Sequence, residues 1–245
     1  MRYEGTVTIG FKNVEKIKSE VLQYLGRRGQ IVPDDLNNLV EECIALMQKA
    51  ASSRHVRLSF SVSHDNDSFY LAAAGILLQG KDIVRHLSGC SQAVLLAATL
   101  GAEADALIHR WKRVDITRSL ILDACATQFI EGYCDEIQQQ ICAEAAASNL
   151  VATWRFSPGY GDFSLDIQPK ILEALNASRR IGLTCTEHFI MLPRKSVTAV
   201  IGLTGEAGFN DKADSQTGAF GGRRFDSAPA CGGCALRDTC NFRKD

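Results

Sequence analysis

Residues 154–168 read WRFSPGYGDFSLDIQ, a stretch that interrupts a chain otherwise rich in helix-forming residues. Gly159 and Gly161 lack a Cβ, so a ligand can approach their backbone closely, while Pro158 stiffens the segment. Arg155 carries a planar, permanently charged fork that suits a carboxylate or a phosphate. The aromatic side chains that could stack on a flat ring or attract a cation are Trp154, Phe156, Tyr160 and Phe163. The stretch predicts either an ordinary surface turn or a loop shaped around a small ligand.

Outward from this loop, apolar periodicity predicts a mixture of helices and strands. Helices are expected at 11–25, 33–50, 81–90, 103–112, 115–148 and 166–177. Strands are expected at 55–63, 92–101, 181–186 and 196–203, and residues 69–80 as a strand followed by a turn. The long helix has its apolar positions at Leu120, Ile121, Cys125, Phe129, Ile137 and Ile141. Because helices and strands do not alternate regularly, an α+β fold is favoured over a doubly wound sheet.

The charge balance and the apolar runs exclude two classes of partner. Lys and Arg total 27 against 28 Asp and Glu, which gives a formal net charge of −1 and no basic footprint for a nucleic acid. The longest apolar run, residues 93–102, is too short to span a bilayer, and the N-terminus lacks the apolar core of a signal peptide. We therefore expect a soluble, cytoplasmic protein that contacts neither nucleic acid nor membrane.

Three blocks of sequence occur in an order that is familiar from one family. The first block, residues 97–131, precedes the loop and includes the start of the predicted long helix. The second is Arg155-x-x-Pro158-Gly159-Tyr160, and the third is IGLTCTEHFIMLPRKSVTAVIG at 181–202. Within the third block, the positions in register with the family pattern are Thr186, Glu187, Met191, Pro193, Ser196 and Val197. Over residues 90–203 the chain resembles the activation domain of cobalamin-dependent methionine synthase.

This resemblance implies a twisted, mainly antiparallel sheet flanked by helices, one of them long. It also implies an organisation in which residues 1–89 are a scaffold within the same domain and residues 90–204 are the ligand-binding core. Residues 205–245 depart from the family pattern, and their composition predicts a glycine-rich linker and a cysteine-containing tail.

The resemblance implies that the ligand is S-adenosylmethionine. Arg155 would pair with its carboxylate, and the backbone from Pro158 through Gly159 to Gly161 would line the adenosyl and sulfonium groups. Tyr160 matches the family tyrosine that lies toward the corrin, so it is the candidate catalytic residue. Glu131 is the candidate partner of the ligand's ammonium group, although the family glutamate aligns with Thr127, one helical turn earlier.

The expected function is that of a stand-alone reactivation protein, acting in trans as part of methionine synthase activity. The chain contains no D-x-H-x-x-G cobalamin-binding signature. It should therefore support reductive remethylation of cob(II)alamin carried by a partner, either a methionine synthase without its own activation domain or another corrinoid protein. An electron donor is a further implied partner. The alternatives are a non-catalytic module that senses S-adenosylmethionine or a corrinoid, and a redox protein that uses a cysteine-ligated centre.

The C-terminal tail carries Cys231, Cys234 and Cys240, three of the chain's nine cysteines. A C-x-x-C pair lets two thiolates reach one metal, and the third cysteine could complete a zinc or iron–sulfur site if a fourth ligand arrives. The same pair could instead be a redox dithiol or an unligated tail.

Overall fold

The computed structural model describes residues 2–5, 14–26, 32–65 and 68–205, and its centre is a five-stranded sheet in the order β1-β2-β6-β10-β7. The strands are β1 (Arg2–Gly5), β2 (Arg54–Ser61), β6 (Gln92–Thr99), β7 (Leu150–Ala152) and β10 (Ser196–Gly205). All neighbours are antiparallel, and β6 pairs along its whole length with β2 on one side and β10 on the other. The expected α+β fold with a mainly antiparallel sheet is confirmed.

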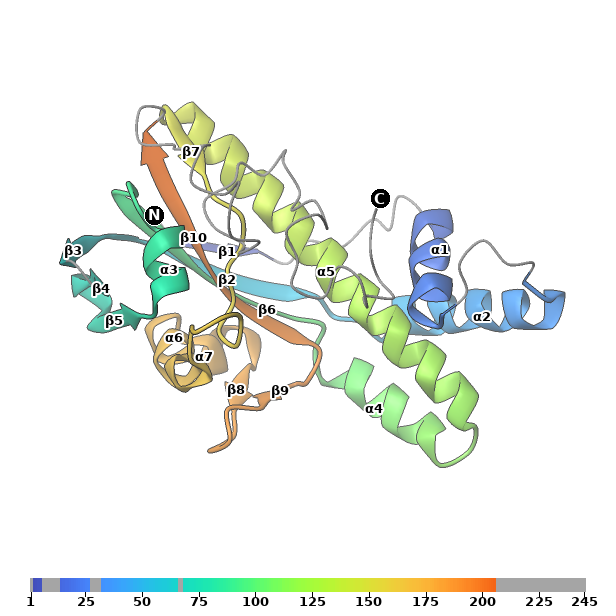
Figure 1. Cartoon of the computed structure of the whole chain (residues 1–245). Helices are drawn as coiled ribbons and strands as arrows, with labels where there is room; N and C mark the ends of the chain where they lie inside the picture. Colours follow the sequence, from blue (N-terminus) through green and yellow to red (C-terminus); the bar gives the residue numbers. More distant parts are fainter. Residues whose placement is uncertain (1, 6–13, 27–31, 66–67, 206–245) are drawn as a thin grey trace.

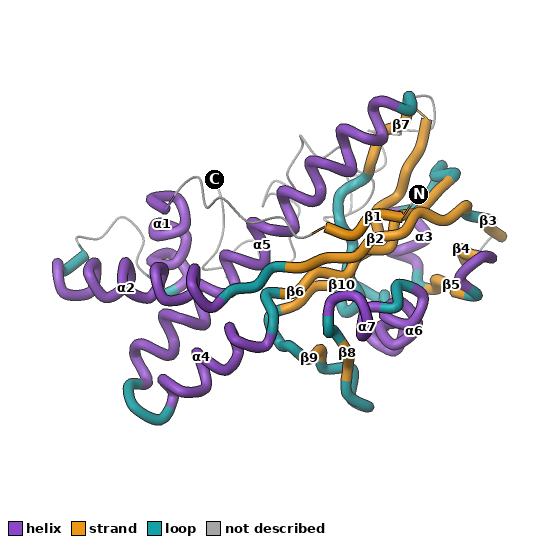
Figure 2. The backbone as a smooth tube through the Cα atoms, turned by 180° about the vertical axis from the view of Figure 1, so that it is seen from behind, coloured by secondary structure: helices purple, strands orange, loops and turns teal. Residues whose placement is uncertain are grey.

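One face of the sheet is covered by helices, and the longest of them, α5 (Ile116–Ala147), runs along it (Figure 1). The side chain of Asp115 accepts a hydrogen bond from the Arg118 N–H at 3.0 Å, which satisfies one of the free donors at the helix start. The helices that gather around the N-terminal half of α5 are α1 (Val14–Tyr24), α2 (Asp34–Ala50) and α4 (Ala102–Lys112) (Figure 2). Within the described part of the chain, no helix is both long and apolar enough to cross a membrane.

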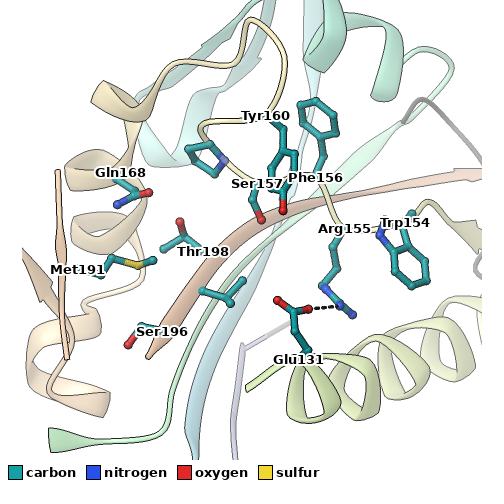
Figure 3. A pocket seen from close by; sticks show the side chains of 12 residues that line it. Glu131, Trp154, Arg155, Phe156, Ser157, Tyr160, Gln168, Met191, Ser196 and Thr198 are labelled. Carbon is teal, nitrogen blue, oxygen red and sulfur yellow. Dashed lines mark hydrogen bonds and ion pairs between the residues drawn. The ribbon is translucent and has the colours of Figure 1, made fainter. Parts of the chain in front are cut away.

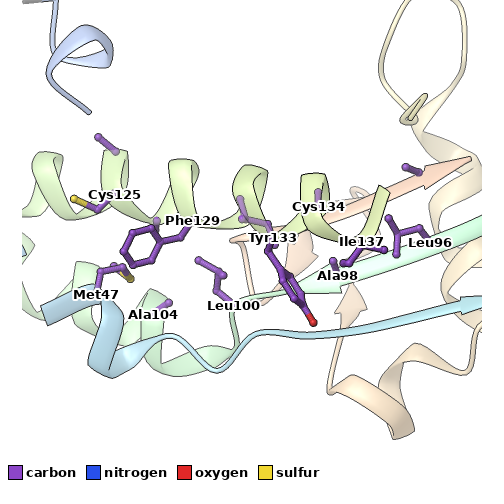
Figure 4. Close-up of a cluster of buried hydrophobic side chains, with 14 of the residues drawn as sticks. Met47, Leu96, Ala98, Leu100, Ala104, Cys125, Phe129, Tyr133, Cys134 and Ile137 are labelled. Atoms are coloured by element: carbon purple, nitrogen blue, oxygen red, sulfur yellow. The ribbon is translucent and has the colours of Figure 1, made fainter. Parts of the chain in front are cut away.

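The core on this face is built around Phe129 and Tyr133 of α5, which are both fully buried (Figure 4). They pack with Met47 of α2, with Leu96 of β6 and with Leu100, which follows β6. Burying one such side chain contributes about 1.5–3 kcal/mol, so this cluster fixes α5 on the sheet. That position matters for function because the opposite side of α5 carries Glu131.

A buried histidine at this core makes folding sensitive to pH. The buried His55 and the hydroxyl of Tyr133 form a hydrogen bond of 2.8 Å. Burial, with a further contribution from Arg57 and against the opposing effect of Glu144, lowers the pKa of His55 from 6.5 to about 4. Between these pH values the unfolded chain binds a proton that the folded chain does not. The contribution of neutral His55 to the free energy of unfolding is therefore fully present above pH 6.5 and is lost as the pH falls toward 4.

We expect His55 alone to lower the free energy of unfolding by about 2.5 kcal/mol between pH 7 and pH 4.5. Urea unfolding of the wild type and of His55→Gln at both pH values measures this, because the variant should lack that part of the pH dependence. His188→Gln, which alters a histidine whose side chain is 80% exposed, is the control. Equal pH dependence in wild type and His55→Gln would contradict the prediction.

The other face of the sheet carries short elements packed on a second core, which includes Phe156 and Phe163 from the loop. The strands here are β3 (Ser63–Asp65), β4 (Ser68–Leu71), β5 (Ile76–Gln79), β8 (Thr184–Cys185) and β9 (Met191–Leu192). The helices are α3 (Lys81–His86), α6 (Gln168–Ala174) and α7 (Ala177–Ile181), with short 3₁₀ turns at Ala72–Ala74 and Leu165–Ile167. In Figure 1 the loop leads from β7, beside α5, to α6 on the other side of the sheet.

Two local expectations were wrong on this face. The strand expected at 181–186 shrinks to Thr184–Cys185, because Ile181 is buried as the last residue of α7 and Gly182, with φ +68°, ends that helix. The helix expected at 166–177 stops at Ala174, and Asn176 with φ +52° separates it from α7. In both places a left-handed residue turns the chain, so that short elements can follow the curved surface of the sheet.

Candidate functional site

The loop quoted first is an extension of the sheet that ends in a tight turn. Past β7, Phe156 exchanges two backbone hydrogen bonds with Val200 of β10, at 2.9 and 2.8 Å. The chain then reverses, and the Gly159 N–H donates to the Phe163 carbonyl at 2.7 Å. Gly159 has φ +93° and Gly161 has φ +55°, values that L side chains rarely adopt. The two glycines are therefore explained by the turn itself.

A reciprocal contact between two aspartates, which we call the aspartate clasp, holds this turn against the start of α3. The carboxylate of Asp162 accepts hydrogen bonds from the N–H groups of Lys81 at 2.7 Å and Asp82 at 3.0 Å. These N–H donors lower the pKa of Asp162. In return, the Asp162 N–H donates to Asp82 Oδ2 at 3.4 Å. The clasp joins the tip of the loop to a segment that lies 80 residues earlier in the sequence.

Between the loop, α5, α6 and the start of β10 lies a cavity of about 300 Å³ (Figure 3). Its lining residues are Glu131, Trp154, Arg155, Phe156, Ser157, Pro158, Tyr160, Gln168, Met191, Ser196, Val197 and Thr198. This volume lies at the small end of the range for small-molecule pockets. Three aromatic rings, several hydroxyl and amide groups and one pair of opposite charges therefore converge on one space, as they do in ligand sites.

The structure brings most of the expected site residues to this cavity. Arg155, Pro158, Tyr160 and Glu131 all line it, although they come from the loop and from α5. Gly159 and Gly161 shape the turn and are not among the lining residues. Tyr160 is 56% exposed at the tip, where a partner molecule could reach it.

Arg155 is the central charged group of the site, and only 7% of its side chain is exposed. Its Nη2 donates to Asp135 Oδ1 at 2.8 Å and to Glu131 Oε2 at 3.4 Å. The guanidinium carbon lies 5.0 Å from the centre of the Trp154 ring, a cation–π contact. Desolvation is the largest cause of a raised pKa at Glu131, and Asp135 adds to it while Arg155 opposes it.

Two buried polar atoms of the cavity wall lack a hydrogen-bond partner among the described residues. They are Nη1 of Arg155 and Oγ1 of Thr198, a residue that is 2% exposed. Buried polar groups are nearly always paired, and each unpaired one costs about 1–3 kcal/mol. Both atoms belong to residues that line the cavity.

Sequence reasoning missed Asp135, Gln168 and Thr198. Asp135 follows Glu131 by one helical turn, and that spacing was the available signal for a second carboxylate beside Arg155. Gln168 and Thr198 gave no signal, because a buried polar residue in a short helix or a strand looks like any other until its neighbours are known. Thr127, where the family glutamate aligns, accepts a hydrogen bond from Lys195 Nζ at 3.0 Å and does not line the cavity.

The tail cysteines Cys231, Cys234 and Cys240 lie outside the described residues, so their metal site stays a prediction. Within residues 2–5, 14–26, 32–65 and 68–205, no group of three or more His, Cys, Asp or Glu side chains is arranged to hold a metal ion.

Together the fold and cavity define an α+β protein in which a loop and a long helix enclose a cavity lined by one arginine and one glutamate. The fold is similar to that in a crystal structure of the MetH reactivation domain bound to AdoHcy, with a TM-score of 0.60. The sequences are 16% identical, and the match covers 82% of this chain and 78% of that one. No protein-family model matches the chain, and neither does any curated protein sequence. The likeness establishes the fold.

Proposed function

We propose that this protein binds S-adenosylmethionine in the cavity and supports reductive remethylation of cob(II)alamin carried by a partner protein. The observation that carries the proposal is that one cavity holds a buried arginine and, 3.4 Å from its Nη2, a carboxylate whose side chain is 55% exposed. An amino acid carries the two opposite charges that this pair requires. The likeness in fold to a domain crystallised with AdoHcy supports the same ligand class.

The residues present fit each part of the ligand. The carboxylate would pair with Arg155 and the ammonium group with Glu131, since both side chains line the cavity and lie within ion-pair distance of each other. Tyr160 supplies a ring at the cavity, and Thr198 contributes a hydroxyl group to its lining. Because Tyr160 is exposed beside the cavity, it would lie between the bound ligand and an approaching corrinoid.

The chemistry needs no acid, base or covalent nucleophile from this chain. S-adenosylmethionine supplies an electrophilic methyl group. One electron from an outside donor reduces the partner's cob(II)alamin, and the methyl group then passes from sulfur to cobalt, leaving S-adenosylhomocysteine. The contribution of Arg155, Glu131 and Tyr160 is to hold the sulfonium group at the surface where a partner's corrin can meet it. Positioning of this kind can supply a large share of a barrier reduction.

The test combines the protein with a corrinoid protein in the cob(II)alamin state, a chemical or protein reductant and S-adenosylmethionine labelled in its methyl group. Transfer of label to the corrinoid only when this protein is present would support the proposal. The protein could bind S-adenosylmethionine while no label reaches either methionine synthase or another corrinoid protein. That result would instead favour a sensing module. The absence of both would overturn the proposal.

A redox role for the cysteine tail remains a second prediction. If Cys231, Cys234 and Cys240 ligate an iron–sulfur centre, protein prepared without oxygen should be coloured, and replacing all three by Ser should remove the colour. A colourless, metal-free wild type would contradict it. Such a centre would be suited to deliver the electron that the remethylation requires.

A further inference from the structure

The two carboxylates that hold Arg155 differ in their relation to the cavity. Glu131 lines the cavity, whereas Asp135, one turn further along α5, does not. The contact of Arg155 with Asp135 is the shorter one, 2.8 Å against 3.4 Å to Glu131. A charge-assisted N–H···O hydrogen bond is strongest near 2.8 Å, so Asp135 is the firm partner and Glu131 the loose one.

The geometry leaves little freedom to the guanidinium group. It is planar, its Nη2 is fixed by Asp135 and its face lies over Trp154. With these two constraints met, Nη1 is the terminal nitrogen that has no partner among the described residues. The arginine is therefore held in one orientation before any ligand arrives, which lowers the entropic cost of binding.

We propose that Asp135 is a positioning residue for Arg155, which holds the guanidinium group in the orientation that meets the carboxylate of the proposed ligand. This rests on the proposed function and adds one residue to its site. Without Asp135 the guanidinium group could turn away, so the loss of affinity should fall on ligands that carry a carboxylate.

The chain offers a matched control elsewhere on α5. Arg118 donates to Glu42 at 2.9 Å and lies 4.7 Å from the centre of the Trp111 ring, an arrangement like that of Arg155, Asp135 and Trp154. Neither Arg118 nor Glu42 lines the cavity. Glu42→Gln therefore removes the same kind of interaction at a place without a proposed ligand.

The experiment compares two thioether ligands that differ in the amino acid group, S-adenosylhomocysteine and 5′-methylthioadenosine. Asp135→Asn should weaken S-adenosylhomocysteine about 10-fold, and leave 5′-methylthioadenosine within about 2-fold. Asp135→Glu should recover part of the loss, and Glu42→Gln should change neither affinity. Both carboxylates are partly exposed, 44% for Asp135 and 61% for Glu42, so both variants should fold. Equal weakening of the two ligands, or no weakening, would overturn the proposal.

A spectroscopic measurement tests the positioning role without any ligand. The chain has two tryptophans, so Trp111→Phe leaves the emission of Trp154 alone. Asp135→Asn in that background should change this emission, because the guanidinium group is no longer held over the ring. Unchanged emission would overturn the positioning role. If wild-type protein binds no adenosyl ligand but the emission does change, the proposed function fails while Asp135 remains the residue that orients Arg155.

Discussion

Arg155→Ala should weaken the binding of S-adenosylmethionine by roughly 10- to 100-fold, the effect expected from losing a buried, charge-assisted pair. The side chain is 7% exposed, and its Nη1 is a buried donor with no partner in the described part of the chain. The variant should still fold, because the two carboxylates it leaves behind, Glu131 and Asp135, are 55% and 44% exposed and can be hydrated.

Arg155→Lys separates charge from shape at the same position. Lysine keeps the positive charge and loses the planar fork that meets Asp135 and a ligand at once. Its affinity should fall between those of the wild type and Arg155→Ala. Calorimetric titration of the three proteins measures the series, and circular dichroism confirms that each is folded. Wild-type affinity in both variants would mean that Arg155 has only a structural role.

Gly161→Ala should lower the free energy of unfolding by about 3 kcal/mol and should weaken ligand binding as well. A Cβ at this position would lie 2.0 Å from Oδ2 of Asp82, and the residue has φ +55°. The backbone angle costs about 1–2 kcal/mol for an L side chain, and the forced displacement of Asp82 costs about 1–3 kcal/mol more. That displacement removes the contact from the Asp162 N–H to Asp82 Oδ2, one of the three hydrogen bonds of the aspartate clasp, so the tip that carries Tyr160 is held less firmly.

Gly75→Ala is the matched control for this change. Gly75 has φ +64°, and a Cβ there would meet nothing within 4 Å, so only the cost of the backbone angle applies. Urea unfolding of both variants isolates the steric part. Adding Asp82→Ala to Gly161→Ala should recover part of the stability by removing the clash. Equal losses for Gly161→Ala and Gly75→Ala would show that the clasp does not constrain the loop.

Much of the fold follows from local patterns in the sequence. The helices 14–24, 34–50, 102–112 and 116–147 lie close to the ranges expected from apolar spacing, and β2, β6 and β10 are long apolar or alternating runs. The short elements were harder, because Thr184–Cys185 and Leu150–Ala152 obtain their shape from the strands they pair with. Leu120 shows the same limit in a helix, since its spacing marks it as core and yet it is 58% exposed. Apolar spacing locates the stripe of a helix that can pack on the core. It does not show where along the helix the elements that cover this stripe end.

The candidate site was predictable where its residues are unusual and not where they are ordinary. The arginine, proline and glycines of the loop stand out in the sequence, and they led to Glu131 across the cavity. The contact of Asp135 with Arg155 is tertiary, joining residues 20 apart on different elements, and the sequence signals it through the one-turn spacing of Asp135 from Glu131 alone. The aspartate clasp is more remote still, because Asp82 and Asp162 meet only when α3 and the loop fold onto the same face of the sheet.

The measurement that tests the central claim most directly is a calorimetric titration of the folded, monodisperse wild-type protein with S-adenosylmethionine. The account predicts saturable one-to-one binding, competed by S-adenosylhomocysteine. No binding in such a sample would contradict it, because the cavity would then have kept its shape and charges without the ligand that we propose they serve.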